Sequence, residues 1–174
     1  MTNPAQESKN TQLQQGYKSL PFFQQAEVIY DFTYQFCSKY ISTTSRTVDQ
    51  MVQAARSGKQ NVSEGYLQKS MEGRLKLLNV ARGSLEELLN DYQDFLRQRG
   101  LRLWAKDSSQ AQKVRALGYK NYKSYAANAA ICLINQTNAF LDNKLRWTEE
   151  KFVKEGGFRE NLFKKRAEYK RKNQ

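Results

Sequence analysis

Apolar residues recur at steps of three and four along most of the chain, the spacing that places side chains on one face of an α-helix. The first such segment covers residues 20–41, where two apolar stripes run beside each other. The stripes comprise Phe22, Ala26, Ile29, Thr33, Phe36 and Tyr40, and Phe23, Tyr30, Tyr34, Cys37 and Ile41. So wide an apolar face predicts a helix that contacts more than one neighbour.

A second helix is predicted after the polar run 42–45, which supplies a turn and an N-cap. Its apolar positions are Val48, Met51, Val52 and Ala55. Ser57 and Gly58 weaken the pattern and Val62 with Tyr66 resumes it, so we expect a kink near residue 58.

The third helix has the clearest pattern. Its heptad-spaced positions are Met71, Leu78, Leu85 and Tyr92, followed three residues later each time by Ala81, Leu88 and Phe95. Ser70 is the predicted N-cap and Gly100 the predicted stop. Arg82 is expected to pair with Glu86 one turn on.

The remaining helical pattern begins near Asp107, which with Gln110 resembles a capping box, and is interrupted near Gly118. It then runs from residue 120 to 155 with two apolar stripes: Ala126, Ala129, Leu133, Phe140 and Trp147, and Ile131, Ile134, Leu141, Leu145 and Phe152. No segment alternates with period two. These patterns predict an all-α fold: an antiparallel up-down four-helix bundle over residues 20–155, a disordered polar lead-in over 1–19, and a basic suffix with a short helix over 156–174.

Composition narrows the function classes. The 174 residues fit one domain and contain no histidine, which removes the usual general base and metal ligand. We therefore expect no catalytic residue, metal or cofactor, and an enzyme built on Glu64 or Tyr66 stays an alternative. Cys37 and Cys132 are expected to be buried free thiols in a reducing cytoplasm, although a disulfide between them stays open. The chain has no run of 18 apolar residues, so no membrane span is expected.

The net charge of +12 is distributed unevenly. Residues 1–96 contain ten Lys or Arg and ten Asp or Glu, whereas residues 97–174 contain nineteen and seven. An excess confined to one half of a chain indicates an acidic partner, most often nucleic acid and less often an anionic membrane surface.

The segment 97–123 concentrates this charge, with eight basic residues against Asp107. Trp104, Tyr119 and Tyr122 are interleaved, and Tyr125 follows two residues later. Its predicted phosphate contacts are Arg97, Arg99, Arg102, Lys106, Lys113, Arg115, Lys120 and Lys123. Basic side chains attract phosphates and aromatic rings stack on unpaired bases, which favours RNA over duplex DNA. The alternative is a solvated helix face whose aromatic residues pack inward.

The suffix combines apolar and basic residues. Phe158, Leu162 and Tyr169 fall along one side of a short helix, which we expect to dock on the bundle or on a neighbouring subunit. The supporting phosphate contacts predicted here are Lys164, Lys165 and Arg166. Membrane binding by this helix is disfavoured because its apolar side is narrow.

Several stretches resemble a known family. They are NVSEGYLQKSMEGRLKLLNVARGSLEELLNDY (61–92), AANAAICLINQTNAFLDNKL (126–145) and EGGFRENLFKKR (155–166). The first resembles the four-helix-bundle family first noticed in intervening sequences of bacterial large-subunit ribosomal RNA genes. The other two are similar to its suffix-bearing subgroup. The likeness covers roughly residues 22–166.

The resemblance implies a ring-shaped homopentamer with a basic surface. One branch of the family is the accessory variability protein of diversity-generating retroelements, which binds template RNA and a reverse transcriptase. The hypothesis is thus a non-enzymatic, RNA-preferring oligomeric accessory protein with a reverse transcriptase as a candidate partner, and with DNA or an RNA/DNA hybrid left open as ligands. The alternative is a structural scaffold oligomer whose basic surface binds an acidic protein.

Overall fold

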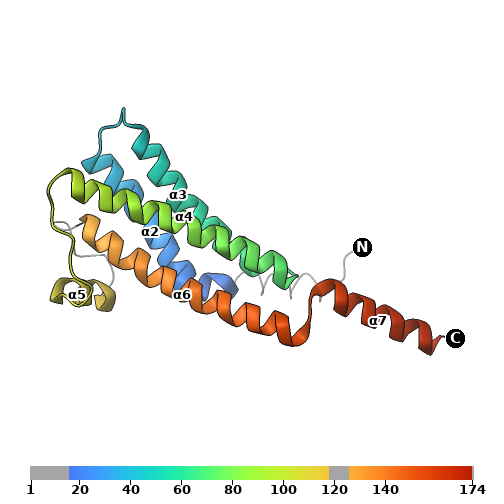
Figure 1. The fold of residues 1–174 in the computed structure, drawn as a ribbon. Helices are drawn as coiled ribbons and strands as arrows, with labels where there is room; N and C mark the ends of the chain where they lie inside the picture. The colour runs from blue at the N-terminus through green and yellow to red at the C-terminus, as the bar shows by residue number, and fades with distance from the viewer. Residues whose placement is uncertain (1–15, 118–125, 174) are drawn as a thin grey trace.

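The computed structural model describes residues 16–117 and 126–173 (Figure 1). Within these ranges the chain forms helices and connections without a strand, so the predicted all-α class is confirmed. The elements are a 3-10 turn η1 (Tyr17–Ser19) and the α-helices α2 (Pro21–Tyr40), α3 (Arg46–Leu67), α4 (Met71–Gln98), α5 (Ser109–Leu117), α6 (Ala126–Glu155) and α7 (Phe158–Lys172). The predicted interruption near Gly118 lies outside the described residues.

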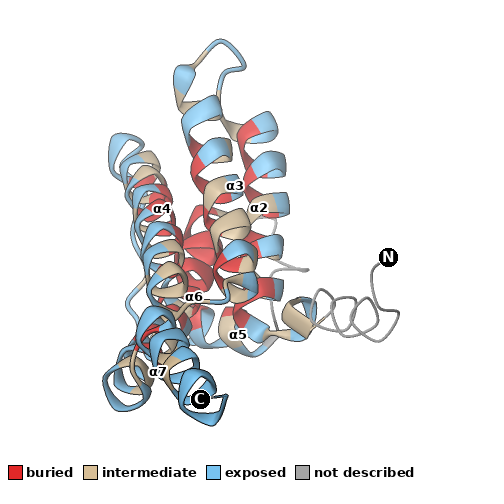
Figure 2. Ribbon diagram, turned by 90° about the vertical axis from the view of Figure 1, so that its right-hand side faces the viewer, coloured by how far each residue is buried: buried red, intermediate tan, exposed pale blue. Residues whose placement is uncertain are grey.

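The helical body consists of α2, α3, α4 and α6, which lie side by side, while α5 packs against α6 near one end (Figure 1). Figure 2 shows the buried positions on the faces that these helices turn toward one another. Ile29, Val62, Leu85 and Ile134, one from each helix, are at most 1% exposed. The four helices therefore share one hydrophobic core.

The weak point predicted at Ser57 and Gly58 does not interrupt α3, because the helix runs unbroken from residue 46 to 67. Gly58 is buried, and a Cβ added there would lie 2.9 Å from Cδ2 of Leu85 on α4. Gly65 repeats the arrangement, with 3.2 Å to Leu78. The glycines thus allow α3 and α4 to approach closely. This packing outweighs the cost of about 1 kcal/mol that each glycine, relative to alanine, adds to helix formation.

The predicted N-cap and the predicted stop of α4 are both confirmed. The Ser70 Oγ accepts a hydrogen bond from the Gly73 N–H at 3.0 Å. Gly100, just beyond the end of α4, has φ +62°, a conformation that glycine adopts without strain. The capping box predicted for Asp107 is wrong: Ser108 caps α5 instead, its Oγ accepting from the Ala111 N–H at 3.2 Å.

A buried polar chain links α2 and α4. The Tyr92 hydroxyl donates to Thr33 Oγ1 at 3.0 Å, and that hydroxyl donates to the Ile29 carbonyl at 2.7 Å. Burial raises the pKa of Tyr92, since the phenolate would lose its hydration. Phe36 packs against Tyr92 and Phe95 with ring centroids 4.9 and 4.8 Å away, so aromatic packing continues from the core toward the end of α4.

Both cysteines are free and buried, as predicted. The Cys37 thiol lies 3.9 Å from the Met51 sulfur. Burial, assisted by the negative charge of Asp91, raises the pKa of Cys37 to about 11. Burial also raises the pKa of Cys132, against a smaller opposing effect of Arg115.

Only part of the apolar pattern of α6 lies in the core. Ala129, Ile131 and Leu141 are buried, whereas Phe140 and Trp147 are 37% and 46% exposed. The Lys144 ammonium lies 3.7 Å from the centre of the Trp147 ring. After the first turns of α6, the apolar stripe that includes Phe140 and Trp147 therefore lies on the protein surface.

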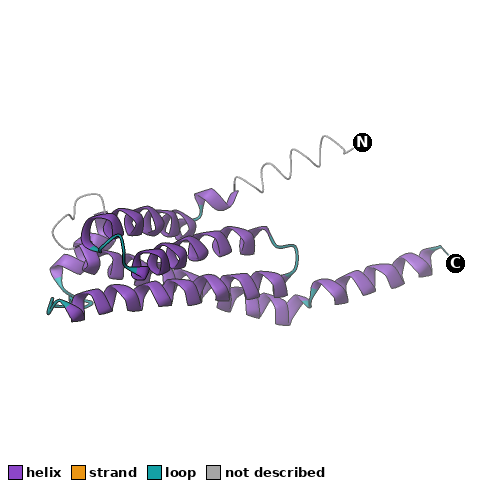
Figure 3. Cartoon of the chain, turned by 90° about the horizontal axis from the view of Figure 1, so that it is seen from above, coloured by secondary structure: helices purple, strands orange, loops and turns teal. Residues whose placement is uncertain are grey.

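Helix α7 extends from the end of α6 away from the helical body (Figures 1 and 3). Gly156 has φ +77° at the junction, and the Glu160 carboxylate accepts from the Gly157 N–H at 3.1 Å. The apolar side chains of α7 remain exposed, from 49% at Phe158 to 74% at Phe163. The expected docking on the chain's own bundle is thus not observed, and docking on a neighbouring subunit stays a prediction.

We expect Gly58→Ala to lower the free energy of unfolding by about 1 kcal/mol. The new methyl group must displace Leu85 in a packed core, which costs about 1–3 kcal/mol and exceeds the gain in helix propensity. Gly83→Ala is the matched control on α4, because nothing lies within 4 Å of its added Cβ, and it should gain about 0.5–1 kcal/mol. Urea unfolding of both variants measures the difference. An equal gain in the free energy of unfolding for the two variants would contradict the close contact between Gly58 and Leu85.

Stability should fall as pH rises from about 8.5, where the thiol of Cys37 ionises in the unfolded chain, toward about 11, where it ionises in the folded protein. Between these values the unfolded chain releases a proton that the folded protein retains. Cys37→Ala should give a shallower decline over this pH range, because it removes that proton release. Urea unfolding under reducing conditions at several pH values tests this, and parallel curves would contradict it.

Candidate nucleic-acid interface

Six of the predicted phosphate-contacting residues gather at one end of the helical body, where α4 ends and the connection leads into α5 (Figure 1). We call them the connection surface: Arg97, Arg99, Arg102, Lys106, Lys113 and Arg115. Arg115 is half-buried and the other five are exposed. Asp107 is the one acidic residue within 97–117, so this segment carries an excess of positive charge, although Asp91 and Asp94 of α4 lie beside Arg99.

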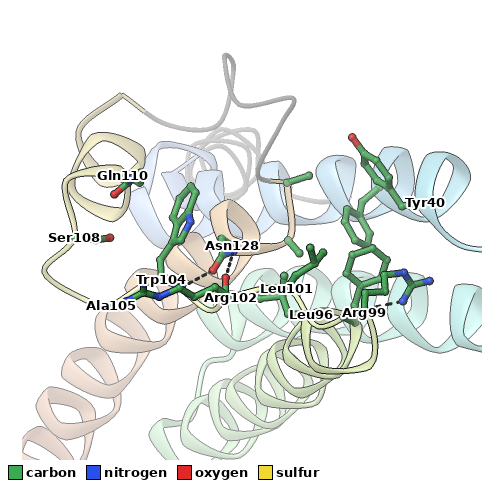
Figure 4. A pocket seen from close by; sticks show the side chains of 14 residues that line it. Tyr40, Leu96, Arg99, Leu101, Arg102, Trp104, Ala105, Ser108, Gln110 and Asn128 are labelled. Atoms are coloured by element: carbon green, nitrogen blue, oxygen red, sulfur yellow. Dashed lines mark hydrogen bonds between the residues drawn. The ribbon is translucent and has the colours of Figure 1, made fainter.

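The Asn128 side chain holds the connection against α6. Its Oδ1 accepts from the Trp104 N–H at 2.8 Å, and its Nδ2 donates to the Arg102 carbonyl at 3.0 Å (Figure 4). Asn128 is only 5% exposed. Both polar atoms of the buried Asn128 carboxamide therefore have hydrogen-bond partners. The two backbone groups that they contact lie in the connection, where no helix supplies partners.

A cavity of about 670 Å³ opens beside this clamp. Phe36 and Tyr40 from α2, Phe95 from α4 and Trp104 from the connection give it aromatic walls. Figure 4 shows Trp104 and Arg99 on opposite sides, with Leu101 between them. The described lining residues include Arg99 and Arg102 but no carboxylate, so the cavity is both aromatic and electropositive.

The arginines at the end of α4 differ in their contacts. The Arg99 guanidinium lies 3.8 Å from the centre of the Phe95 ring, which places the cation on the cavity wall. Arg97 instead pairs with Asp94, with Nη2 and Oδ1 2.9 Å apart. Such an exposed pair is worth about 1 kcal/mol or less, so a phosphate can replace the carboxylate at little cost.

Helix α5 presents the remaining cations. Ala111 and Val114 are at most 1% exposed and bind α5 to α6 through apolar contact. Lys113 lies on the exposed side. The Arg115 guanidinium donates to the Lys106 carbonyl and so holds the connection as well as carrying charge.

The other predicted contacts do not join this group. Lys120 and Lys123, with Tyr119, Tyr122 and Tyr125, lie outside the described residues. We call Lys164, Lys165 and Arg166 the suffix surface; all three are exposed on α7, at the opposite end of α6 (Figure 1). The 30 residues of α6 span about 45 Å between its two ends, and the suffix surface lies further along α7.

Sequence reasoning missed Asn128 and the aromatic walls. Asn128 stands between alanines in the otherwise apolar run AANAAICL, and an isolated polar residue in such a run signals a buried hydrogen-bonding role. The helical spacing of Phe36, Tyr40 and Phe95 predicts packing alone. Their second role depends on a contact between distant segments.

The residues of the alternative enzyme hypothesis lie elsewhere. Glu64 is exposed, and the Tyr66 ring packs 6.3 Å from Tyr17. Within residues 16–117 and 126–173, no group of His, Cys, Asp or Glu side chains is arranged to hold a metal ion. No helix in the described part of the chain has the length and apolarity needed to cross a bilayer.

Comparison of the chain with protein-family models, curated proteins and solved structures finds no match. The case for a function therefore depends on the geometry and charge of the site.

We expect Asn128→Ala to lower the free energy of unfolding by about 1–3 kcal/mol, because it leaves the Trp104 N–H and the Arg102 carbonyl without their partner. Asn135→Ala is the matched control: Asn135 is exposed and donates one hydrogen bond within α6, so its loss should cost under about 0.5 kcal/mol. Urea unfolding followed by Trp104 fluorescence in a Trp147→Phe background measures both. Equal small effects would show that the clamp does not hold the connection.

Proposed function

We propose that this protein is a non-enzymatic, RNA-preferring accessory protein whose primary contact is the connection surface. The supporting observation is that six basic residues with a single acid between them lie at one end of the helical body. Cations concentrated in this way bind phosphates through counterion release, without requiring a particular base sequence.

The aromatic residues beside these cations favour RNA with unpaired bases. Trp104, Tyr40 and Phe95 line a cavity between the cationic side chains, and aromatic faces stack on bases that are not already stacked in a duplex. A duplex offers this end only its phosphates, so it should bind more weakly than a single strand of equal charge.

The architecture that goes with this function is an antiparallel up-down four-helix bundle formed by α2, α3, α4 and α6, with α7 as the suffix helix. We propose that it assembles as a homo-oligomer, a pentamer by the family resemblance. Apolar side chains exposed on α7, such as Leu162 and Phe163, support a partner surface. Five copies at +12 would present about +60 to an RNA. A reverse transcriptase is the protein partner that the resemblance implies.

Reversing Arg102, Lys106 and Lys113 to Glu should abolish retention of a single-stranded RNA in a filter assay at about 100 mM salt. The change removes phosphate contacts and adds repulsion, and none of the three side chains holds the connection in place. The control reverses Arg56, Lys69 and Lys76, which are equally exposed, and changes the net charge by the same amount.

Equal retention by both triple variants, with the oligomer intact by size-exclusion chromatography, would refute this placement of the site. Wild-type retention that does not weaken with salt would contradict phosphate binding itself. Absence of RNA retention together with capture of an acidic protein would favour the scaffold alternative.

A further inference from the structure

We propose that the cavity between α2, α4 and the connection receives an unpaired nucleobase of the bound RNA, with the adjoining phosphate held by Arg99 and Arg102. This inference rests on the RNA binding proposed above and assigns it a specific pocket. Its volume of about 670 Å³ lies within the range of about 300–1,000 Å³ typical of sites for small organic groups.

The aromatic walls form a continuous surface and not isolated rings. Phe36 contacts Tyr40 at 5.1 Å and Phe95 at 4.8 Å between ring centroids, and Phe36 in turn packs on the core residue Tyr92. Rings fixed by packing lose little conformational freedom when a planar ligand stacks on them. Tyr40 and Phe95, both half-buried, therefore present a rigid apolar surface beside the cations.

The mouth of the cavity contains apolar surface that a base would cover. Leu101 is 51% exposed although it lines the cavity, and it lies between Trp104 and Arg99 (Figure 4). Covering such surface is favourable by about 25 cal/mol per Å². Ser108 and Gln110 add neutral polar groups on the α5 side, which can hydrogen-bond the edge of a base.

Charge complementarity selects a nucleotide over a neutral apolar ligand. Arg99 and Arg102 supply two cations, the described lining residues supply no anion, and Lys106 continues the positive charge along the connection. An aromatic group flanked by phosphates matches this arrangement. A base within a duplex cannot enter the cavity without leaving its stack, so the pocket selects single strands.

The test compares two tryptophan variants. Trp104→Leu removes an aromatic wall of the cavity and keeps every cation, and Trp147→Leu makes the same substitution on the outer face of α6. Trp104→Leu should weaken binding of a uridine 12-mer by about tenfold, the usual worth of one base–aromatic stack, with an unchanged salt dependence. Trp147→Leu should leave the dissociation constant within about twofold of the wild type.

A ligand-side comparison makes the test independent of protein stability. An abasic 12-mer has the same phosphates without bases, so the wild type should bind it about tenfold more weakly than the uridine 12-mer. In a Trp147→Phe background, which leaves the cavity walls intact, the uridine strand should quench Trp104 fluorescence and the abasic strand and a duplex should not.

The possible failures are distinguishable. Salt-dependent binding with equal affinity for the two 12-mers, or with no quenching by the uridine strand, would overturn the pocket and leave the proposed function standing. Absence of salt-dependent binding to any of these nucleic acids would overturn both. Quenching by an acidic aromatic peptide but not by the uridine strand would overturn the pocket in favour of a protein ligand.

Discussion

Close contact between α3 and α4 is the constraint on which the placement of the other elements depends. Gly58 and Gly65 are buried against Leu85 and Leu78, with no room for a larger side chain unless the leucines move. This contact fixes α4 within the core. Phe95 lies in the last turn of α4 and Arg99 caps its end, so packing in the middle of the body determines where the connection surface begins.

The cavity beside the connection surface is a continuation of the core. Aromatic contacts lead from Tyr92 through Phe36 to Phe95, whose outer ring face meets the Arg99 guanidinium. On the other side of the cavity, the two hydrogen bonds of Asn128 attach the connection to α6. A connection without regular structure thus presents cations in a defined arrangement, because its backbone is held at Arg102 and Trp104.

Much of the fold followed from local pattern. The positions of α2 and α4, the cap at Ser70, the stop at Gly100 and the pair of Arg82 with Glu86 all depend on neighbours within one or two turns. The continuity of α3 did not follow, because intrinsic propensity treats Gly58 as a weak point and only the position of Leu85 shows why it is there.

The site was predictable in composition but not in shape. The basic residues of 97–115 could be identified from charge alone. The cavity depends on Asn128, whose hydrogen-bond partners lie 24 and 26 residues away in the sequence, a separation that periodicity does not encode. The distance between the connection surface and the suffix surface likewise depends on the direction that α7 takes after Gly156.

If the proposed function holds, that direction gives each protomer two separate surfaces for nucleic acid. B-form DNA rises about 3.4 Å per base pair, so roughly 13 base pairs of DNA match the 30-residue length of α6. Under the proposed function, a shorter duplex would reach only one of the two surfaces, whereas a longer duplex would gain avidity by occupying both. The rigid length of a single helix would then act as a ruler for nucleic acids bound at two points.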